Sequence, residues 1–169
     1  ERLRLLSKYG VTVYCAPGTE LFRIVDQGLG DHDISRLRLT VSAGERLNDV
    51  VADRWRAATG LPVLEAYGQT ETLMTLANYA CTAPRTGSIG LPIPGLTLAI
   101  VDDNGARMPV GEEGNIALQL PNAQMMLGYY KDDEATRKAC PDGWFRTGDL
   151  GVKYPDGYIE LRSEERRVG

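Results

Sequence analysis

Strand-like and helix-like patterns alternate along the first part of the chain, and this alternation restricts the fold more than any other feature. The segments Val11–Cys15, Arg36–Ser42 and Leu61–Ala66 are short and rich in β-branched or alternating apolar residues, which is typical of strands. Two amphipathic segments, Pro17–Gly28 and Asn48–Gly60, separate them and predict helices. Because strand, helix and strand at this spacing need crossover connections, we expect a parallel sheet covered by helices.

The second of these helices has the clearest local signals. Asn48 is a suitable N-cap, and Gly60 is a suitable residue to end the helix. Apolar residues recur at helical spacing and predict one buried face. The residues expected on that face are Leu47, Val50, Val51 and Trp55.

The second half of the chain has a different pattern, in which short strand-like runs alternate with Gly/Pro turns. Leu96–Asp103 and Gly114–Leu120 predict strands on either side of Asn104–Gly105, a dipeptide suited to a tight turn. Lys131–Ala139 predicts a short surface helix, and Trp144–Tyr154 lies between two Pro-Asp-Gly turn signals. We therefore expect a small, mostly antiparallel, β-barrel-like subdomain here.

These patterns together predict an α/β chain with two parts. Residues 1–83 form the helix-covered, mainly parallel part, and residues 84–161 form the β-rich subdomain, with a loop-rich boundary between them. The last eight residues, 162–169, abandon the earlier patterning and resemble the translation of a sequencing adapter, so we expect them to lie outside the fold. A charged, solvated helix end is the alternative for this tail.

Composition excludes several classes of protein. The net charge of −4 leaves no basic stripe for nucleic acid, and no apolar run approaches the roughly 20 residues of a transmembrane helix. The three cysteines are far apart in the sequence and the single histidine, His32, lies between two aspartates, so neither a disulfide scaffold nor a zinc site is expected. We expect the cysteines to be buried, reduced thiols and His32 to be a solvated loop residue.

The segment EAYGQTET, Glu65–Thr72, combines an aromatic ring, a glycine, an amide, two hydroxyls and two carboxylates within eight residues. It follows the third predicted strand, and ligands of open α/β sheets bind at the carboxyl ends of parallel strands. The chain has neither a G-x-G-x-x-G nor a G-x-x-x-x-G-K-[ST] sequence, so the dinucleotide and P-loop fingerprints are missing. A purely structural alternative is a strand-to-helix turn in which Thr70 caps the helix and Glu71 favours its N-terminus.

Four short sequence motifs follow one another along the chain. They are YGQTE (Tyr67–Glu71), GEEGNIALQL (Gly111–Leu120), MLGYYKDDEAT (Met126–Thr136) and WFRTGDL (Trp144–Leu150). In order and approximate spacing they resemble the adenylate-forming enzymes, which include acyl-CoA synthetases, luciferase-like enzymes and peptide-synthetase adenylation domains. The resemblance extends to Leu161. It is greatest to medium-chain acyl-CoA synthetases, because YGQTET is followed by GSIGLPIPG and VDDNG. Peptide-synthetase domains more often have proline in place of Gln69.

The resemblance implies a nucleotide site. Tyr67 would offer its ring face to adenine, a stacking contact worth about 1–3 kcal/mol, and Gly68 would let the backbone pass close to the nucleotide. Thr70 would bond an α-phosphate oxygen or the incoming carboxylate, and Glu71 would hold Mg²⁺. Asp149 would accept hydrogen bonds from both ribose hydroxyls.

The complete predicted site combines these residues with a loop and the strand end. The expected nucleotide-binding residues are Gly44, Glu45, Glu65, Ala66, Tyr67, Gly68, Gln69, Thr70 and Asp149, with Thr70 and Glu71 catalytic and Glu71 the metal ligand. For Gly44 and Glu45 the alternative is a plain turn into the next helix. For Asp149 the alternative is a turn aspartate beside Gly148.

The reaction that the resemblance implies has two half-reactions. A carboxylate attacks the α-phosphorus of Mg²⁺-bound ATP to give an acyl-adenylate, and the thiol of coenzyme A then displaces AMP. The expected partners are ATP, Mg²⁺, coenzyme A and a small carboxylic acid of fatty or medium length; the oligomeric state stays open.

Relatives also use an upstream lysine loop and a C-terminal lysine, and neither has a match here. We therefore expect an internal fragment that is inactive alone. The alternatives are a peptide-synthetase adenylation domain, a luciferase-like oxygenase, a non-catalytic nucleotide-binding relative and a purely structural α/β module.

Overall fold

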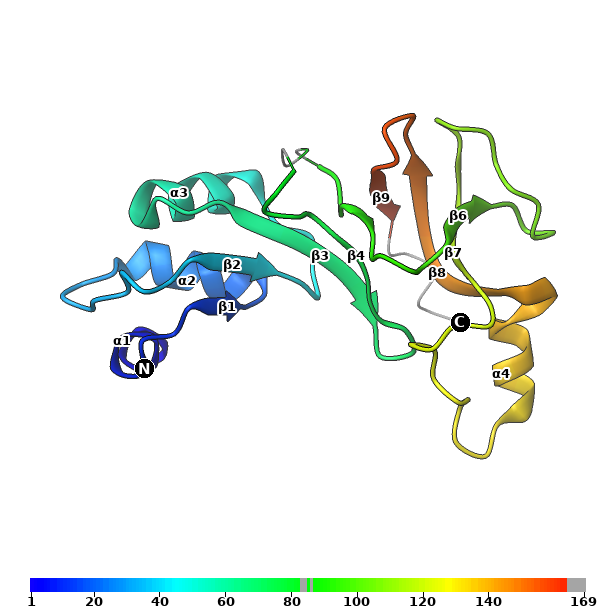
Figure 1. Ribbon diagram of the computed structural model, residues 1–169, viewed down its shortest axis with the longest axis horizontal. Helices are drawn as coiled ribbons and strands as arrows, with labels where there is room; N and C mark the ends of the chain where they lie inside the picture. The colour runs from blue at the N-terminus through cyan, green and yellow to red at the C-terminus, as the bar shows by residue number, and fades with distance from the viewer. Residues whose placement is uncertain (83–84, 86, 164–169) are drawn as a thin grey trace. The chain divides into compact units, whose positions relative to one another are not determined.

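The computed structural model describes residues 1–82, 85 and 87–163 (Figure 1). The chain forms two compact units, Glu1–Ala66 and Tyr67–Gly169. Among the described residues, none of the helices has both the length and the apolar character that a membrane span requires.

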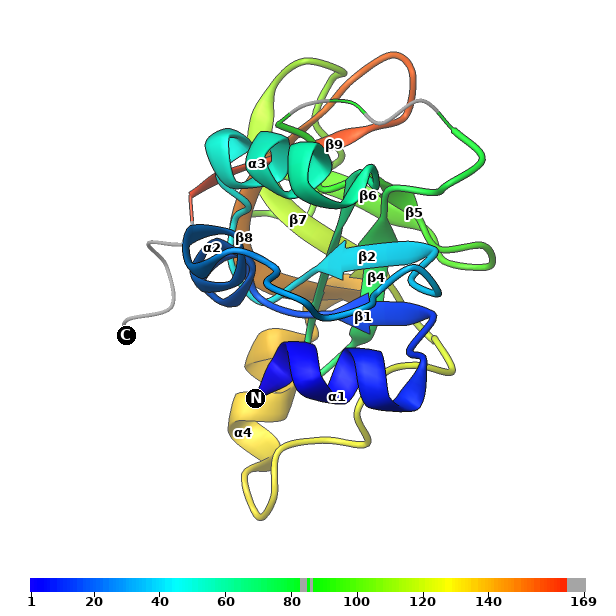
Figure 2. The same ribbon diagram turned by 90° about the vertical axis from the view of Figure 1, so that its left-hand side faces the viewer.

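The first unit contains the predicted parallel sheet. Its elements are α1 (Arg2–Tyr9), β1 (Val13–Cys15), α2 (Gly18–Gln27), β2 (Leu39–Ser42), α3 (Asp49–Thr59) and the start of β3 (Val63–Gln69). Both strand pairs, β1 with β2 and β2 with β3, are parallel, and Figure 2 shows β1 and β2 side by side. The predicted α/β class with helices on a parallel sheet is confirmed.

A buried tryptophan fixes α3 to the sheet of the first unit. The Trp55 ring is fully buried, stacks with Tyr14 of β1 at a centroid distance of 6.2 Å, and donates its indole N–H to Thr40 Oγ1 at 3.1 Å. A buried indole that keeps a hydrogen-bond partner avoids the desolvation penalty of an orphaned donor. Trp55 therefore orients α3 through packing and through one specific bond.

The predicted face of α3 is correct at three positions and wrong at one. Asn48 caps the helix, accepting from Val50 N at 2.9 Å, and Gly60 ends it in a left-handed conformation with φ of 76°. Leu47, Val51 and Trp55 are buried, but Val50 is 63% exposed. The three buried residues follow an i, i+4, i+8 stripe, and Val50, one residue before Val51, lies about 100° away from it around the helix.

The prediction of buried thiols is also wrong. Cys15 and Cys81 are exposed and Cys140 is half-buried, and all three are free thiols. Cys15 lies on β1, which is the first strand in the sheet order, so one of its edges has no partner within the described ranges. Val13 and Cys15 are exposed on this edge strand.

The second unit is mostly antiparallel, as predicted. After the end of β3 it contains β4 (Leu73–Ala77), β5 (Leu91–Pro92), β6 (Leu98–Val101), β7 (Glu113–Gln119), α4 (Asp133–Ala139), a short 3₁₀ turn (Pro141–Gly143), β8 (Trp144–Lys153) and β9 (Ile159–Ser163). Strands β6, β7, β8 and β9 form one antiparallel sheet in that order, and β4 pairs antiparallel with β5. β8 curves along its length (Figure 1).

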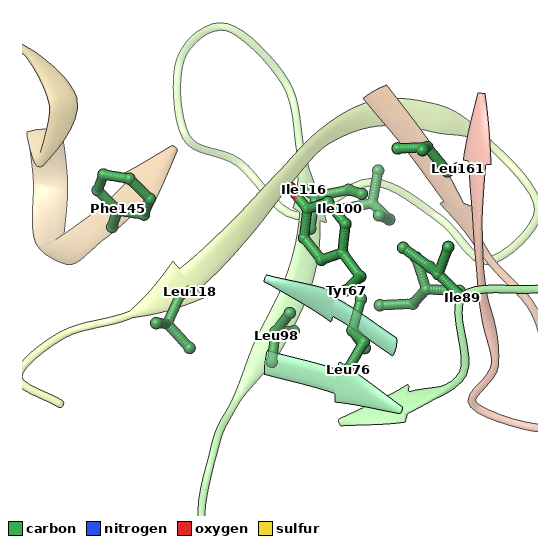
Figure 3. Packing of buried hydrophobic residues seen from close by; sticks show 10 residues of the cluster. Tyr67, Leu76, Ile89, Leu98, Ile100, Ile116, Leu118, Phe145 and Leu161 are labelled. Carbon is green, nitrogen blue, oxygen red and sulfur yellow. The ribbon is translucent and has the colours of Figure 1, made fainter. Parts of the chain in front are cut away.

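Large aliphatic and aromatic side chains, from β3, β4 and the segment just before β5 and from the four-stranded sheet, form the core of the second unit (Figure 3). The cluster consists of Tyr67, Leu76, Ile89, Leu98, Ile100, Ile116, Leu118, Phe145, Ile159 and Leu161. Each fully buried aliphatic or aromatic side chain contributes about 1.5–3 kcal/mol to burial free energy. This core holds β4 and the end of β3 against the four-stranded sheet, which matters for the site because Tyr67 belongs to it.

The predicted domain limits differ in position from the compact units. The units divide after Ala66, inside β3, whereas the sequence placed the boundary after residue 83, and residues 83 and 84 lie outside the described ranges. β9 continues to Ser163, opposite Leu150, two residues past the predicted end of the β-rich part. Residues 164–169 lie outside the described ranges, so the adapter origin of the tail stays a prediction.

Candidate functional site

The QTET sequence forms a tight turn between two strands. β3 ends at Gln69 and β4 begins at Leu73, with Thr70–Thr72 between them. Thr72 N donates to Gln69 O, and Gln69 N donates to Thr72 Oγ1, each at 3.2 Å, so the turn is closed from both sides. The structural alternative of a helix capped by Thr70 is wrong, because the next element is a strand.

Gly68 is required by the backbone of this hairpin. A Cβ atom at this position would lie 1.9 Å from the carbonyl oxygen of Leu73 and 2.8 Å from the Cα of Met74. Both distances are far below van der Waals contact, so any other residue would force β3 and β4 apart. Gly68 therefore has a role in folding, and its role beside a nucleotide stays a prediction.

Tyr67, Gln69 and Asp149 meet in a buried hydrogen-bond network. The Tyr67 hydroxyl donates to Asp149 Oδ2 at 2.5 Å, and the Gln69 amide nitrogen donates to the same oxygen at 2.9 Å. That nitrogen also donates to the Thr147 carbonyl at 2.9 Å. Since both partners of the amide are acceptors, its nitrogen must face them. Residues that the sequence assigned to one site from distant blocks are thus in direct contact.

A bulge in β8 brings Asp149 to this position. Arg146 pairs with Ala117 and Leu150 pairs with Asn115, so Thr147, Gly148 and Asp149 stand opposite the single residue Ile116. Gly148 has a φ of 80°, a conformation that favours glycine. Such bulges re-aim side chains. The TGD sequence is therefore an irregularity inside one long strand, and the turn predicted as the alternative for Asp149 is wrong.

The bulge is held by the hydroxyl of Thr147. This hydroxyl donates to the Ile116 carbonyl at 2.9 Å and accepts from Asp149 N at 3.2 Å. The Asp149 side chain is completely buried. A buried carboxylate that accepts from two donors is fixed in orientation by charge-assisted bonds, which are stronger than neutral ones. The ring of Tyr67 is only 8% exposed and packs in the core cluster, so its stacking on adenine stays a prediction.

Glu71 lies at the tip of the turn and has a partner that the sequence reasoning missed. Thr70 is exposed and Glu71 is half-buried. The Tyr129 hydroxyl donates to Glu71 Oε1 at 3.0 Å, and Met126 N donates to the Glu71 carbonyl at 2.7 Å. Both partners belong to the block MLGYYKDDEAT, which the sequence analysis identified but to which it gave no role at the site.

The remaining predicted residues belong to the first unit, where both carboxylates accept a backbone N–H. Glu45 Oε1 accepts from Thr19 N at 2.5 Å, in the first turn of α2. Glu65 Oε1 accepts from Leu47 N at 3.2 Å, just before α3, and burial raises the pKa of the Glu65 carboxyl. Gly44 is exposed and Ala66 is buried. Carboxylates next to helix N-termini are favourable on electrostatic grounds alone, so their roles beside a nucleotide stay predictions.

Comparison with known proteins decides the family. The AMP-binding enzyme family matches residues 1–130. This chain belongs to the AMP-binding enzyme family. It is 38% identical over 160 residues to the mitochondrial acyl-coenzyme A synthetase ACSM3 of Mus musculus, a match that covers 93% of this chain and 28% of that protein. The resemblance to medium-chain acyl-CoA synthetases is thereby confirmed.

Two solved structures of AMP-binding relatives have the same fold. One is an ATP-bound RpMatB-BxBclM chimera, with a TM-score of 0.87 and 28% identity over 98% of this chain and 33% of that one. The other is the anthranilate CoA ligase AuaEII in complex with anthranoyl-AMP, with a TM-score of 0.86 and 31% identity over 95% of this chain and 31% of that one. This AMP-binding chain thus spans about a third or less of the length of its relatives.

Glu71 of the AMP-binding chain would suit a magnesium ion that binds together with nucleotide phosphates. Within the described ranges, no group of three His, Cys, Asp or Glu side chains could form a closed metal cage. Mg²⁺ needs none, because it commonly binds through one or two carboxylates together with substrate phosphates. Glu71, a single half-buried carboxylate beside the exposed Thr70, matches that requirement.

Proposed function

We propose that this chain holds the adenylate in an ATP-dependent carboxylate–CoA ligase, and that the whole protein makes acyl-CoA through an acyl-adenylate. The observation that carries the proposal is the convergence of Tyr67 and Gln69 on the buried carboxylate of Asp149. The similarity to ACSM3 and to structures with bound ATP and acyl-AMP supports the same conclusion.

Asp149 is the proposed ribose ligand. Two vicinal hydroxyls of a ribose both donate, and a carboxylate is the side chain with two equivalent acceptor oxygens. Tyr67 and Gln69 hold its Oδ2 by two bonds, which restrains this oxygen before a nucleotide binds. Pre-organisation of this kind lowers the entropy that binding would otherwise cost.

Thr70 and Glu71 are the proposed contacts to the reacting phosphate. Thr70 is exposed at the tip of the turn, where its hydroxyl can donate to an α-phosphate oxygen. Glu71 would ligate Mg²⁺, which when bound neutralises charge on the phosphates. Both residues sit on a turn closed by two hydrogen bonds, so they are positioned by β3 and β4 and not by a free loop.

The proposed reaction balances in two steps. A carboxylate oxygen of the acid attacks the α-phosphorus, the bond to the β-phosphate oxygen breaks, and pyrophosphate leaves. The sulfur of coenzyme A, having lost its proton, then attacks the acyl carbon, and AMP leaves with the electron pair of the broken C–O bond. The protein contributes orientation and charge stabilisation, the main terms in phosphoryl-transfer sites.

The test is an assay of the full protein that contains this sequence. We expect acid-dependent exchange of labelled pyrophosphate into ATP, and CoA-dependent AMP release that is greatest with fatty or medium-length acids. The 169-residue chain alone is expected to give no sustained exchange. Exchange driven by amino acids, with no transfer to CoA, would favour a peptide-synthetase adenylation domain instead, and no exchange with any acid would refute the proposal.

A further inference from the structure

We propose that Tyr129 is a positioning residue that orients the Glu71 carboxylate for Mg²⁺-bound ATP. The inference rests on the proposed function and deepens its metal site. It starts from the bond in which the Tyr129 hydroxyl donates to Glu71 Oε1 at 3.0 Å. The two residues are 58 positions apart in sequence, so the contact is a product of the fold.

The segment that precedes Tyr129 is hydrogen-bonded to the turn between β3 and β4 at several points. The Gln124 amide nitrogen donates to the carbonyls of Thr72 and Met74, at 3.2 and 2.8 Å. Met126 N donates to the Glu71 carbonyl at 2.7 Å. Figure 1 shows this segment, after β7, beside the turn between β3 and β4. The main chain of the turn is therefore fixed by the same segment that supplies the tyrosine.

Tyr129 is itself anchored to α4. Its backbone N–H donates to Thr136 Oγ1 at 2.9 Å, and that hydroxyl donates to the Asp132 carbonyl at 2.9 Å. Asp132 is the N-cap of α4, with its side chain accepting from Ala135 N. The tyrosine is thus held at its main chain by a helix and at its hydroxyl by Glu71.

The chemistry of the pair suits a metal ligand and its support. A phenol hydroxyl is a neutral donor, so it orients a carboxylate and leaves its negative charge in place for a cation. Hydrogen-bond partners that orient metal ligands typically contribute 10-fold to 100-fold to metal affinity or activity.

The experiment measures metal binding in the full-length ligase, independently of turnover. Mn²⁺ replaces Mg²⁺, and its free concentration is followed by electron paramagnetic resonance in the presence of α,β-methylene-ATP, which cannot be cleaved at the α-phosphorus. We expect Tyr129→Phe to weaken Mn²⁺ binding about tenfold. The KM for the carboxylic acid should not change. Tyr130→Phe is the matched control, because its neighbouring ring is 87% exposed, and it should bind Mn²⁺ like the wild type.

A second variant distinguishes orientation of the Glu71 carboxylate by Tyr129 from a general effect of Tyr129→Phe on the structure. Glu71→Gln removes the metal ligand, so Tyr129→Phe should cause no further loss in that background. The inference is overturned if Tyr129→Phe binds Mn²⁺ like the wild type, or if its effect persists undiminished beside Glu71→Gln. Failure of the proposed function is a different result, in which the wild type itself catalyses no acid-dependent pyrophosphate exchange.

Discussion

Glu45 and Glu65 of the first unit and Asp149 of the second were all assigned to a nucleotide site, yet the fold holds them in different ways. Glu45 and Glu65 each accept one backbone N–H beside the start of a helix. Asp149 is completely buried, and its Oδ2 accepts from two side chains that are 80 or more residues away in sequence. Stabilisation of a helix start explains the first arrangement. The second needs another reason, because burying a charge costs free energy.

The way in which a carboxylate is held indicates whether it serves folding or function. An acid that stabilises a nearby helix would be kept in any protein with that helix. An acid that is buried and oriented by two long-range donors is an arrangement that folding alone would more simply replace by apolar packing. We therefore expect Asp149 of the second unit to matter for nucleotide binding, and Glu45 and Glu65 of the first unit to matter for stability.

The largest effect is expected from Gly68→Ala in the second unit. The new Cβ would lie 1.9 Å from the Leu73 carbonyl, so the hairpin must open, and we expect a loss of unfolding free energy of about 4 kcal/mol. Urea denaturation of the full protein measures it. Gly18→Ala in the first unit is the control, since its new Cβ meets Leu47 at an ordinary 3.4 Å and stability should hardly change. Similar stability of the two variants would contradict the hairpin geometry.

Asp149→Asn should abolish most of the affinity for AMP. Hydrogen bonds to a charged group are worth about 1.5–3 kcal/mol, so the Kd measured by calorimetry should rise by about 10-fold to 100-fold. Asp156→Asn is a matched control, because Asp156 is a surface acid paired with Arg85. An Asp149→Asn protein that folds and binds AMP normally would remove the distinction drawn here between the two units.

Glu45→Ala should lower the stability of the protein, whether or not Glu45 also contacts the nucleotide. Removal of a side chain that caps a helix costs about 1 kcal/mol. Glu45→Gln keeps an acceptor for Thr19 N and should restore most of the loss in thermal denaturation. A weaker AMP affinity with unchanged stability would instead place Glu45 in the nucleotide site.

The smallest effect is expected from the pH dependence that Glu65 causes. Burial raises the folded-state pKa of Glu65, so folding favours its protonated form. Its contribution to stability is therefore greatest at low pH and falls as pH rises from the ordinary carboxyl range through the raised folded value. Glu65→Gln cannot titrate at this position. The loss of unfolding free energy that Glu65 contributes between pH 4 and pH 7 should therefore be missing in this variant. An unchanged loss would show that Glu65 titrates normally.

Local signals in the sequence predicted the first unit well. The caps Asn48 and Gly60 and the spacing of Trp55 gave the limits and orientation of α3, because each acts within one or two helical turns. Val50 was misplaced since a run of two valines leaves the helix face ambiguous by one residue. β4 was not predicted: its five residues include the buried Thr75, so it has no alternation that distinguishes a strand.

The site was predicted from family blocks, and its geometry was not predictable from patterns. The bond between Tyr67 and Asp149 depends on how β8 pairs with β7, a long-range property that no local window contains. The contact between Tyr129 and Glu71 has the same origin. Composition and periodicity identify which residues are polar in an apolar setting, but only the register of the strands decides which of them meet.

The irregular pairing at Gly148 makes the site sensitive to the length of β8 as well as to its composition. Successive side chains of a strand point to opposite faces, so removal of Thr147 or Gly148 would turn the aspartate away from Tyr67 although the aspartate itself remained. A relative could therefore retain this aspartate and have lost its nucleotide. Alignment gaps at this point would be more informative about activity than substitutions.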